Sequence, residues 1–213
     1  QQRAPMRLSS LLAGSALALL AVPALAATPA EVVDGYADIA EAAYGDSLAA
    51  ARALGDAVDA FLAAPSAEGL GAARAAWVAA RVPYQQTEVY RFGNPIVDDW
   101  EGRVNAWPLD EGLIDYVDPS YGGATDENAL AALNVIANPL LTVAGREVDA
   151  SAITPELLAE TLDQADGVES NVARGYHAIE FLLWGQDLNG HGPGAGDRPW
   201  TDYAQGPDCT NAN

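Results

Sequence analysis

Residues 66–92 read SAEGLGAARAAWVAARVPYQQTEVYRF, a run rich in alanine and in other residues that favour helices. Ser66 follows Pro65 and can cap the first turn, so the pattern predicts a helix over about 66–91. Pro83 is expected to kink this helix, because proline lacks the N–H that the preceding turn needs. The stretch therefore indicates a helical protein.

A second long helix is predicted before this one. Thr28 and Glu31 form a capping box with Pro29 at the first helical position, so the helix should run to about residue 64. Helical patterns return at 126–138, 154–165 and 167–185, and no stretch shows the strict alternation of a confident strand. We therefore expect an all-α fold, most simply an up-and-down helical bundle.

Residues 93–125 interrupt the helical pattern with glycine, proline, asparagine and aspartate. A structureless loop of this length is uncommon in a compact domain unless it has a function, and its aromatic side chains argue against disorder. We expect one long ordered loop that packs on the bundle through Trp100, Trp107 and Tyr116.

Residues 1–26 have the pattern of upstream residues followed by a Sec-type signal peptide. Met6-Arg7 precedes the apolar run LSSLLAGSALALLAVP, and Ala-Leu-Ala at 24–26 fits the cleavage rule. The mature domain is therefore expected over 27–213. No later apolar run is long enough to span a bilayer, so we expect an exported protein without a transmembrane segment.

The chain is strongly acidic, with 30 Asp and Glu residues against 10 basic ones and a formal net charge of −20. This charge argues against nucleic acid as a partner, because phosphates need a basic face. It also argues against docking on an anionic membrane. It suits a cationic partner such as a metal ion.

The run GYHAIEFLLWGQDLNG, residues 175–190, holds the strongest site candidate. His177 and Glu180 lie one helical turn apart and can reach one point, and helical bundles build metal sites from such pairs. Gly175 is unfavourable inside a helix, which suggests a close approach to the backbone there. The alternative is an ordinary histidine beside an acid, and two ligands alone do not complete a metal site.

The helix over 66–91 supplies a candidate for the third ligand. Trp77, Arg81, Tyr84 and Glu88 are spaced by four, three and four residues, so they are expected to share one helix face. If this face turns inward, Glu88 could complete the site and Arg81 could orient a carboxylate. A solvated Arg–Glu pair beside core aromatics is the alternative.

Acidic residues outside the helices are weaker candidates, because runs of acids are usually solvated. The segment NAWPLDEG, residues 105–112, is an exception, because Trp107 and Pro108 should anchor it. Its acids Asp110 and Glu111 are therefore supporting candidates, together with Trp107. Asp99 and Asp187 are further supporting candidates.

Two long blocks of the sequence resemble the imelysin-like family. The first spans residues 76–118; the second spans 173–203 and carries the GxHxxE motif as Gly175, His177 and Glu180. The resemblance implies an all-α fold of two bundle-like halves, about twice this length, so 27–213 would be the first half, truncated at its C-terminus. It also implies an exported bacterial protein, periplasmic or associated with the outer membrane, that is linked to iron uptake.

Three functions remain open on these grounds. The first is a periplasmic protein of iron uptake that binds a divalent metal ion, iron before zinc, with an iron-transport component of the cell envelope as partner. The second is a zinc metallopeptidase, a class to which the family has also been assigned, but Glu180 as a ligand leaves no evident general base. The third is a non-catalytic module that binds haem, a polysaccharide or a surface partner. We expect the first, and no enzymatic activity.

Overall fold

A computed structural model of the chain describes residues 26–210. The predicted signal segment therefore lies, apart from Ala26, outside the described residues. The described part is mostly helical, as expected. None of its helices is long and apolar enough to cross a membrane.

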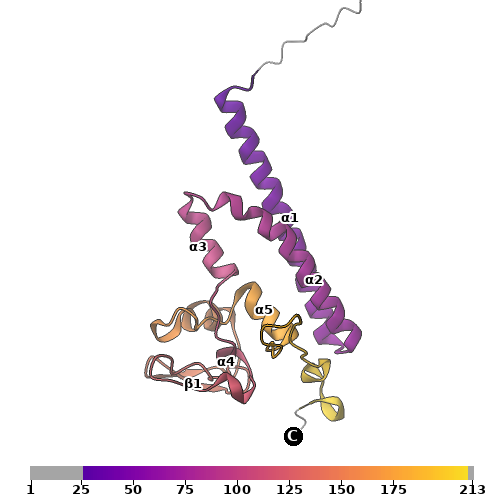
Figure 1. Cartoon of the computed structure of the whole chain (residues 1–213), viewed down its shortest axis with the longest axis vertical. Coiled ribbons are helices and arrows are strands. Elements are labelled where there is room, and N and C mark those ends of the chain that lie inside the picture. Colours follow the sequence, from indigo (N-terminus) through magenta and orange to yellow (C-terminus); the bar gives the residue numbers. More distant parts are fainter. Residues whose placement is uncertain (1–25, 211–213) are drawn as a thin grey trace, which may run out of the picture.

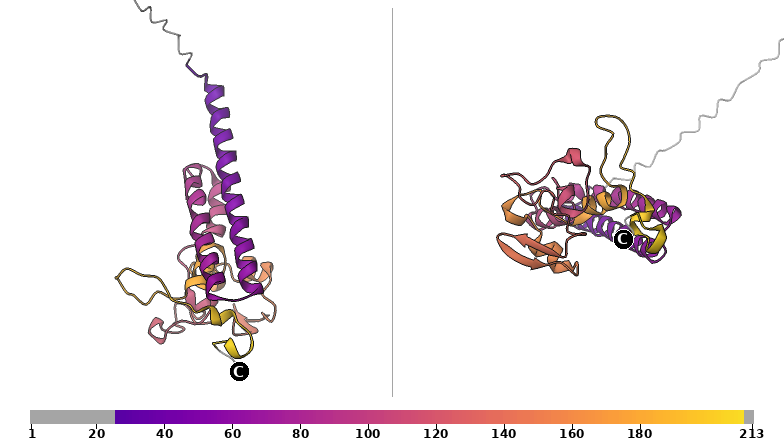
Figure 2. Two further views of the ribbon diagram at one scale, coloured as in Figure 1. Left: turned by 90° about the vertical axis from the view of Figure 1, so that its right-hand side faces the viewer. Right: turned by 90° about the horizontal axis from the view of Figure 1, so that it is seen from below.

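Two long helices, α1 (Pro29–Ala63) and α2 (Ala67–Gln86), form an antiparallel pair (Figure 1). The predicted caps are present: the Thr28 side chain accepts from the Glu31 N–H, and the Ser66 hydroxyl accepts from the Gly69 N–H at 3.0 Å. Figure 2 shows that the N-terminal part of α1 extends beyond the end of α2. Both predicted helices are confirmed, although α2 ends five residues earlier than expected.

The region predicted as a loop contains further helices. After the 3-10 turn η1 (Thr87–Tyr90), the chain forms α3 (Pro95–Val104), the short α4 (Glu111–Ile114) and the turn η2 (Pro119–Tyr121). Trp100 of α3 contacts the rings of Tyr44 and Tyr84, with ring centroids 5.8 and 6.1 Å apart. The region packs on α1 and α2 through Trp100, as predicted, but it forms short helices instead of one long loop. Trp107 and Tyr116 do not pack as predicted: they are 68% and 45% exposed and contact His177 and Asp202.

The helix predicted over 126–138 is absent, because asparagine side chains there replace helical hydrogen bonds. Asn128 accepts from the Leu130 N–H, and Asn134, with φ +47°, accepts from the Ala137 N–H. A hairpin that was not predicted follows: β1 (Leu140–Val143) pairs antiparallel with β2 (Arg146–Asp149).

The predicted helix over 154–165 is reduced to a short π-helical turn, η3 (Leu157–Thr161), followed by the 3-10 turn η4 (Ala165–Gly167). The next helix, α5, covers only Gly175–Trp184 instead of 167–185, and Gly185 ends it as expected. The chain closes with the 3-10 turns η5 (Trp200–Tyr203) and η6 (Gly206–Asp208).

Helix α5 lies between two apolar clusters, with the α1–α2 pair on one side and α4 and the hairpin on the other (Figure 1). Phe181 belongs to the cluster around Leu113, whereas Tyr176 packs with Tyr84 and Leu54. Among the described residues, therefore, only α1 and α2 form a long up-and-down pair. The short α5 carries the motif residues into the middle of the fold.

Candidate functional site

Gly175 brings the start of α5 into contact with the end of α3. Its φ is +86°, and a Cβ at this position would lie 2.7 Å from the carbonyl oxygen of Val104 and 3.2 Å from that of Arg103. The close backbone approach expected at this glycine is therefore present, but α3 supplies it. The glycine stands at the first helical position, not inside a helix as predicted.

One turn further along α5, the motif side chains contact each other. Nδ1 of His177 lies 2.9 Å from Oε2 of Glu180. The histidine side chain is 21% exposed and that of the glutamate 42%, so both remain accessible to a small ion. The Trp107 ring packs against the imidazole at a centroid distance of 4.8 Å, although the tryptophan is 68% exposed.

Glu111, the first residue of α4, adds a carboxylate to this region. Burial raises the pKa of its carboxyl group, and the neighbouring charges of Asp110, Glu180 and Asp187 raise that pKa further, while the charge of Arg198 lowers it. Three carboxylates therefore oppose the ionisation of Glu111. Such a cluster favours the binding of a proton or a cation.

Hydrogen bonds hold the N-terminal end of α4 in place. Asp110 is buried and accepts from the hydroxyl of Tyr121 at 2.6 Å and from the amide of Asn128 at 2.8 Å. Asn171, which is fully buried, exchanges hydrogen bonds with Asn128. Asp110 is thus fully engaged within the fold, and it positions Glu111 without facing solvent itself.

Glu88 does not join this group. The α-helix ends at Gln86, and the tighter 3-10 turn that follows changes the direction of the side chains, so Glu88 is exposed on η1. That turn packs against α1 and α2, whereas His177 and Glu180 lie beside Trp107 and Glu111. The expected common face of residues 77–88 is therefore broken at its last member.

Arg81 has a different role from the one expected. Its guanidinium donates to Oδ1 of Asn105 at 2.5 Å and stacks on the rings of Tyr84 and Tyr176 at 5.0 and 5.1 Å. Asn105 in turn donates to Glu101. The arginine reaches a carboxylate only through an asparagine, and that carboxylate is not Glu88.

Of the remaining candidates, Asp99 is exposed on α3, and Asp187 is exposed after α5, where it accepts from the backbone and side chain of Asn189. Glu101 was not singled out from the sequence, yet it is buried and pairs with Arg91 at 3.2 Å. The one signal for it is its position in α3, a helix that the sequence analysis did not predict.

The donors present fit part of a metal site. An imidazole nitrogen and carboxylate oxygens suit iron or zinc. Within the described residues, however, no three histidine, cysteine, aspartate or glutamate side chains gather closely enough to hold an ion. The structure brings His177 and Glu180 together, with Glu111 as a nearby carboxylate, and it does not assemble the predicted group of His177, Glu180 and Glu88.

Comparison with known proteins adds two findings. Iron-regulated protein A of Synechococcus elongatus is 33% identical over 81 residues, which cover 38% of this chain and only 23% of that protein. The family described as imelysin, a peptidase family by name, matches residues 40–212, which include most of α1, all of α2 and the motif on α5. With a match over most of its length, the chain belongs to the imelysin family.

Proposed function

We propose that this protein is an exported, periplasmic metal-binding protein of iron uptake, whose ion binds to His177 and Glu180. Glu111 becomes the third ligand when its side chain moves towards this pair. The contact between the two motif side chains carries this proposal. Beside it lies the carboxyl group of Glu111, whose pKa is raised by burial and by neighbouring carboxylates. A divalent cation would relieve the repulsion among these carboxylates. The relation to an iron-regulated protein favours iron over zinc.

Each protein group has a distinct part in such a site. The imidazole and the two carboxylates would bind the ion, and Trp107 would restrict the rotation of the imidazole, on which it packs. Asp110 and Tyr121 would hold Glu111 in position, because the tyrosine hydroxyl also accepts from the Glu111 N–H at 3.1 Å. Removing a group that orients a metal ligand in this way commonly lowers the metal affinity by about 10–100-fold.

Metal titration of the chain with Fe(II) without oxygen, and with Zn(II), tests the proposal. We expect His177→Ala and Glu111→Gln to weaken binding by about tenfold or more, and acidification to weaken it because the ligands must lose their protons. Glu88→Gln is the matched control and should leave the affinity unchanged.

Two results would contradict this assignment. If Glu88→Gln and Glu111→Gln lower the metal affinity equally, Glu88 is also a ligand, as the spacing of residues 77–88 predicted. Cleavage of a peptide by the purified protein that disappears in His177→Ala would instead favour the metallopeptidase alternative, which the family name raises.

A further inference from the structure

A row of aromatic side chains runs from the surface of α1 to the start of α5. In order, this aromatic row consists of Tyr36, Tyr90, Tyr44, Trp100, Tyr84 and Tyr176. Neighbouring rings have their centroids 4.9–6.1 Å apart, within the usual range for packed aromatic pairs. The contacts are continuous, although the members come from α1, η1, α2, α3 and α5.

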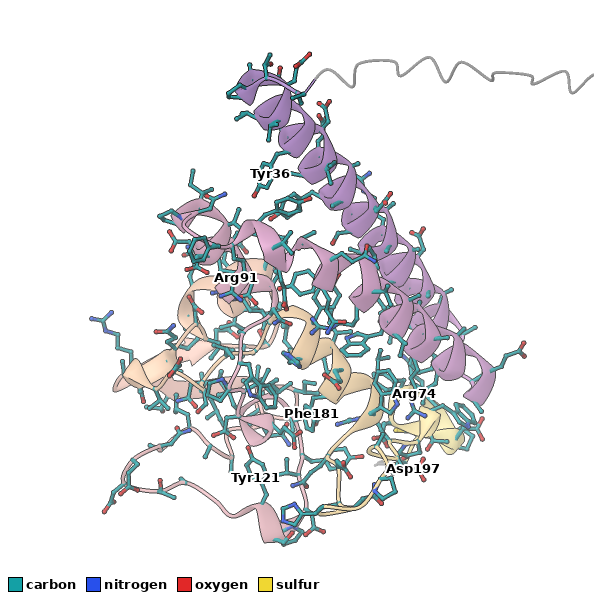
Figure 3. All side chains as sticks on the ribbon, turned by 45° about the horizontal axis from the view of Figure 1, so that its top comes forward. Tyr36, Arg74, Arg91, Tyr121, Phe181 and Asp197 are labelled. Atoms are coloured by element: carbon teal, nitrogen blue, oxygen red, sulfur yellow. The ribbon has the colours of Figure 1, made fainter. Side chains whose placement is uncertain are left out.

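The members of the aromatic row differ in their access to water. Tyr36 is 56% exposed, and Figure 3 marks it near the N-terminal end of α1. Trp100, in the middle, is 39% exposed. Tyr84 and Tyr176 are buried at the other end, where Tyr176 precedes His177 of the motif. The row therefore connects the middle of the fold with the surface.

All members of the aromatic row are tyrosine or tryptophan, the aromatic side chains that lose a single electron most readily. The sequence also has three phenylalanines, which resist oxidation and would fill similar space, but none of them belongs to the row. Cysteine and methionine, which oxidants commonly attack, occur once each, as Cys209 and Met6. A one-electron oxidant that reaches this fold therefore takes its electron chiefly from a tyrosine or a tryptophan.

A tyrosine that loses an electron also loses its phenolic proton, so proton acceptors direct the transfer. The Tyr84 hydroxyl donates to Oε1 of Glu101 at 3.2 Å, so its proton can shift to the carboxylate and return. The Tyr44 hydroxyl is buried without a hydrogen bond within the described residues, and burial raises the pKa of this phenol. Exposed Tyr36 can instead release its proton to water. The oxidised state is therefore most stable at Tyr36.

We propose that the aromatic row transfers single electrons from Tyr36 to oxidised side chains in the core, so that the oxidising equivalent leaves the fold at the surface. The co-reactant is a one-electron oxidant, such as a radical formed from a peroxide. When this oxidant has made a neutral radical of Trp100, the indole gains an electron through the row and a proton from water. Tyr36 loses the electron, gives its phenolic proton to water and becomes a tyrosyl radical. The proposal does not depend on metal binding at His177.

Pulse radiolysis of the metal-free chain with the azide radical tests this transfer. The azide radical takes an electron from an exposed tryptophan and becomes the azide ion, while the indole proton goes to water. We expect the absorption of the tryptophan radical to convert rapidly into that of the tyrosyl radical, at a rate that does not change with protein concentration. Dityrosine cross-links that form afterwards between two molecules should contain Tyr36, as determined by peptide mass spectrometry.

Tyr44→Phe keeps an aromatic ring in place but interrupts the row between Trp100 and Tyr90. It should abolish the rapid conversion and the cross-link at Tyr36. Since the Tyr44 hydroxyl makes no hydrogen bond within the described residues, this variant should retain the fold. Tyr116→Phe removes an exposed phenol outside the row, and as the matched control it should retain both signals.

Trp100→Phe provides the same test from the other side of the interruption, and it serves if Tyr44→Phe does not fold. It removes the tryptophan of the row, so the rapid conversion should again be lost. Trp107→Phe is its matched control, because Trp107 is more exposed, at 68%, but lies outside the row. This control should lower the initial yield of tryptophan radical and retain the rapid conversion.

Three outcomes would overturn the proposal. The first is a conversion rate proportional to protein concentration, because the electron would then pass between molecules. The second is a rapid conversion that Tyr44→Phe or Trp100→Phe retains. The third is loss of the rapid conversion in Tyr116→Phe or Trp107→Phe, which would place the path outside the aromatic row.

Discussion

Ionised Glu111 is expected to favour metal binding but to lower the stability of the metal-free fold. A carboxyl group whose folded pKa is raised favours folding at low pH, and this contribution is lost as the pH rises through the folded pKa. Ionised Glu111, facing Asp110, Glu180 and Asp187, therefore weakens the metal-free fold at neutral pH. Glu111→Gln should therefore stabilise the metal-free protein at pH 7.5 while it weakens metal binding.

Urea unfolding of both forms, with and without Zn(II), measures the two effects together. The stability difference without metal should shrink as the pH falls towards the ordinary glutamate pKa, because the wild-type carboxyl group is then protonated as well. A variant that is less stable than the wild type in the absence of metal would mean that Glu111 stabilises the fold, and that repulsion from its neighbours does not weaken it.

At the scale of elements, cap residues predicted the two long helices, whereas the shorter helices and the hairpin were not predicted correctly. Thr28 and Ser66 marked the starts of α1 and α2 correctly. Pro95 begins α3, but its neighbours Gly93 and Asn94 favoured a loop. The hairpin was missed because its turn, Ala144-Gly145, has positive φ at both residues, although alanine rarely adopts that conformation.

Gly175 fixes how α5 meets α3, and this contact is testable by one methyl group. Gly175→Ala places a Cβ against the Val104 carbonyl at a positive φ, so we expect a loss of about 2–4 kcal/mol in the free energy of unfolding. Gly71→Ala in the exposed part of α2, where a Cβ meets nothing within 4 Å, should instead stabilise the protein by about 0.5–1 kcal/mol. Equal effects in thermal unfolding would refute this account of the motif glycine.

At the scale of the whole molecule, the contact between His177 and Glu180 could be predicted from the sequence. Which carboxylates lie near this pair could be predicted only in part. Local spacing predicts that His177 meets Glu180, because both lie on one helix. Which third carboxylate approaches depends on long-range packing: Glu88 was favoured by helical spacing, but the helix ends before it. Local patterns likewise did not predict the role of Arg74. Its guanidinium donates to the carbonyls of Leu183 and Arg198, which are distant in the sequence.

The pair of Arg198 and Asp115 joins segments 83 positions apart, so the stability of the fold should depend on it. Asp115→Asn removes one charge from a buried pair and leaves the guanidinium with Asp202 alone, which should cost about 3 kcal/mol of unfolding free energy. Asp98→Asn breaks the exposed pair with Arg91 and should cost at most about 1 kcal/mol. Urea unfolding of the two variants compares them directly. A loss of similar size in both would mean that water reaches Arg198, and that this arginine does not hold the two segments together.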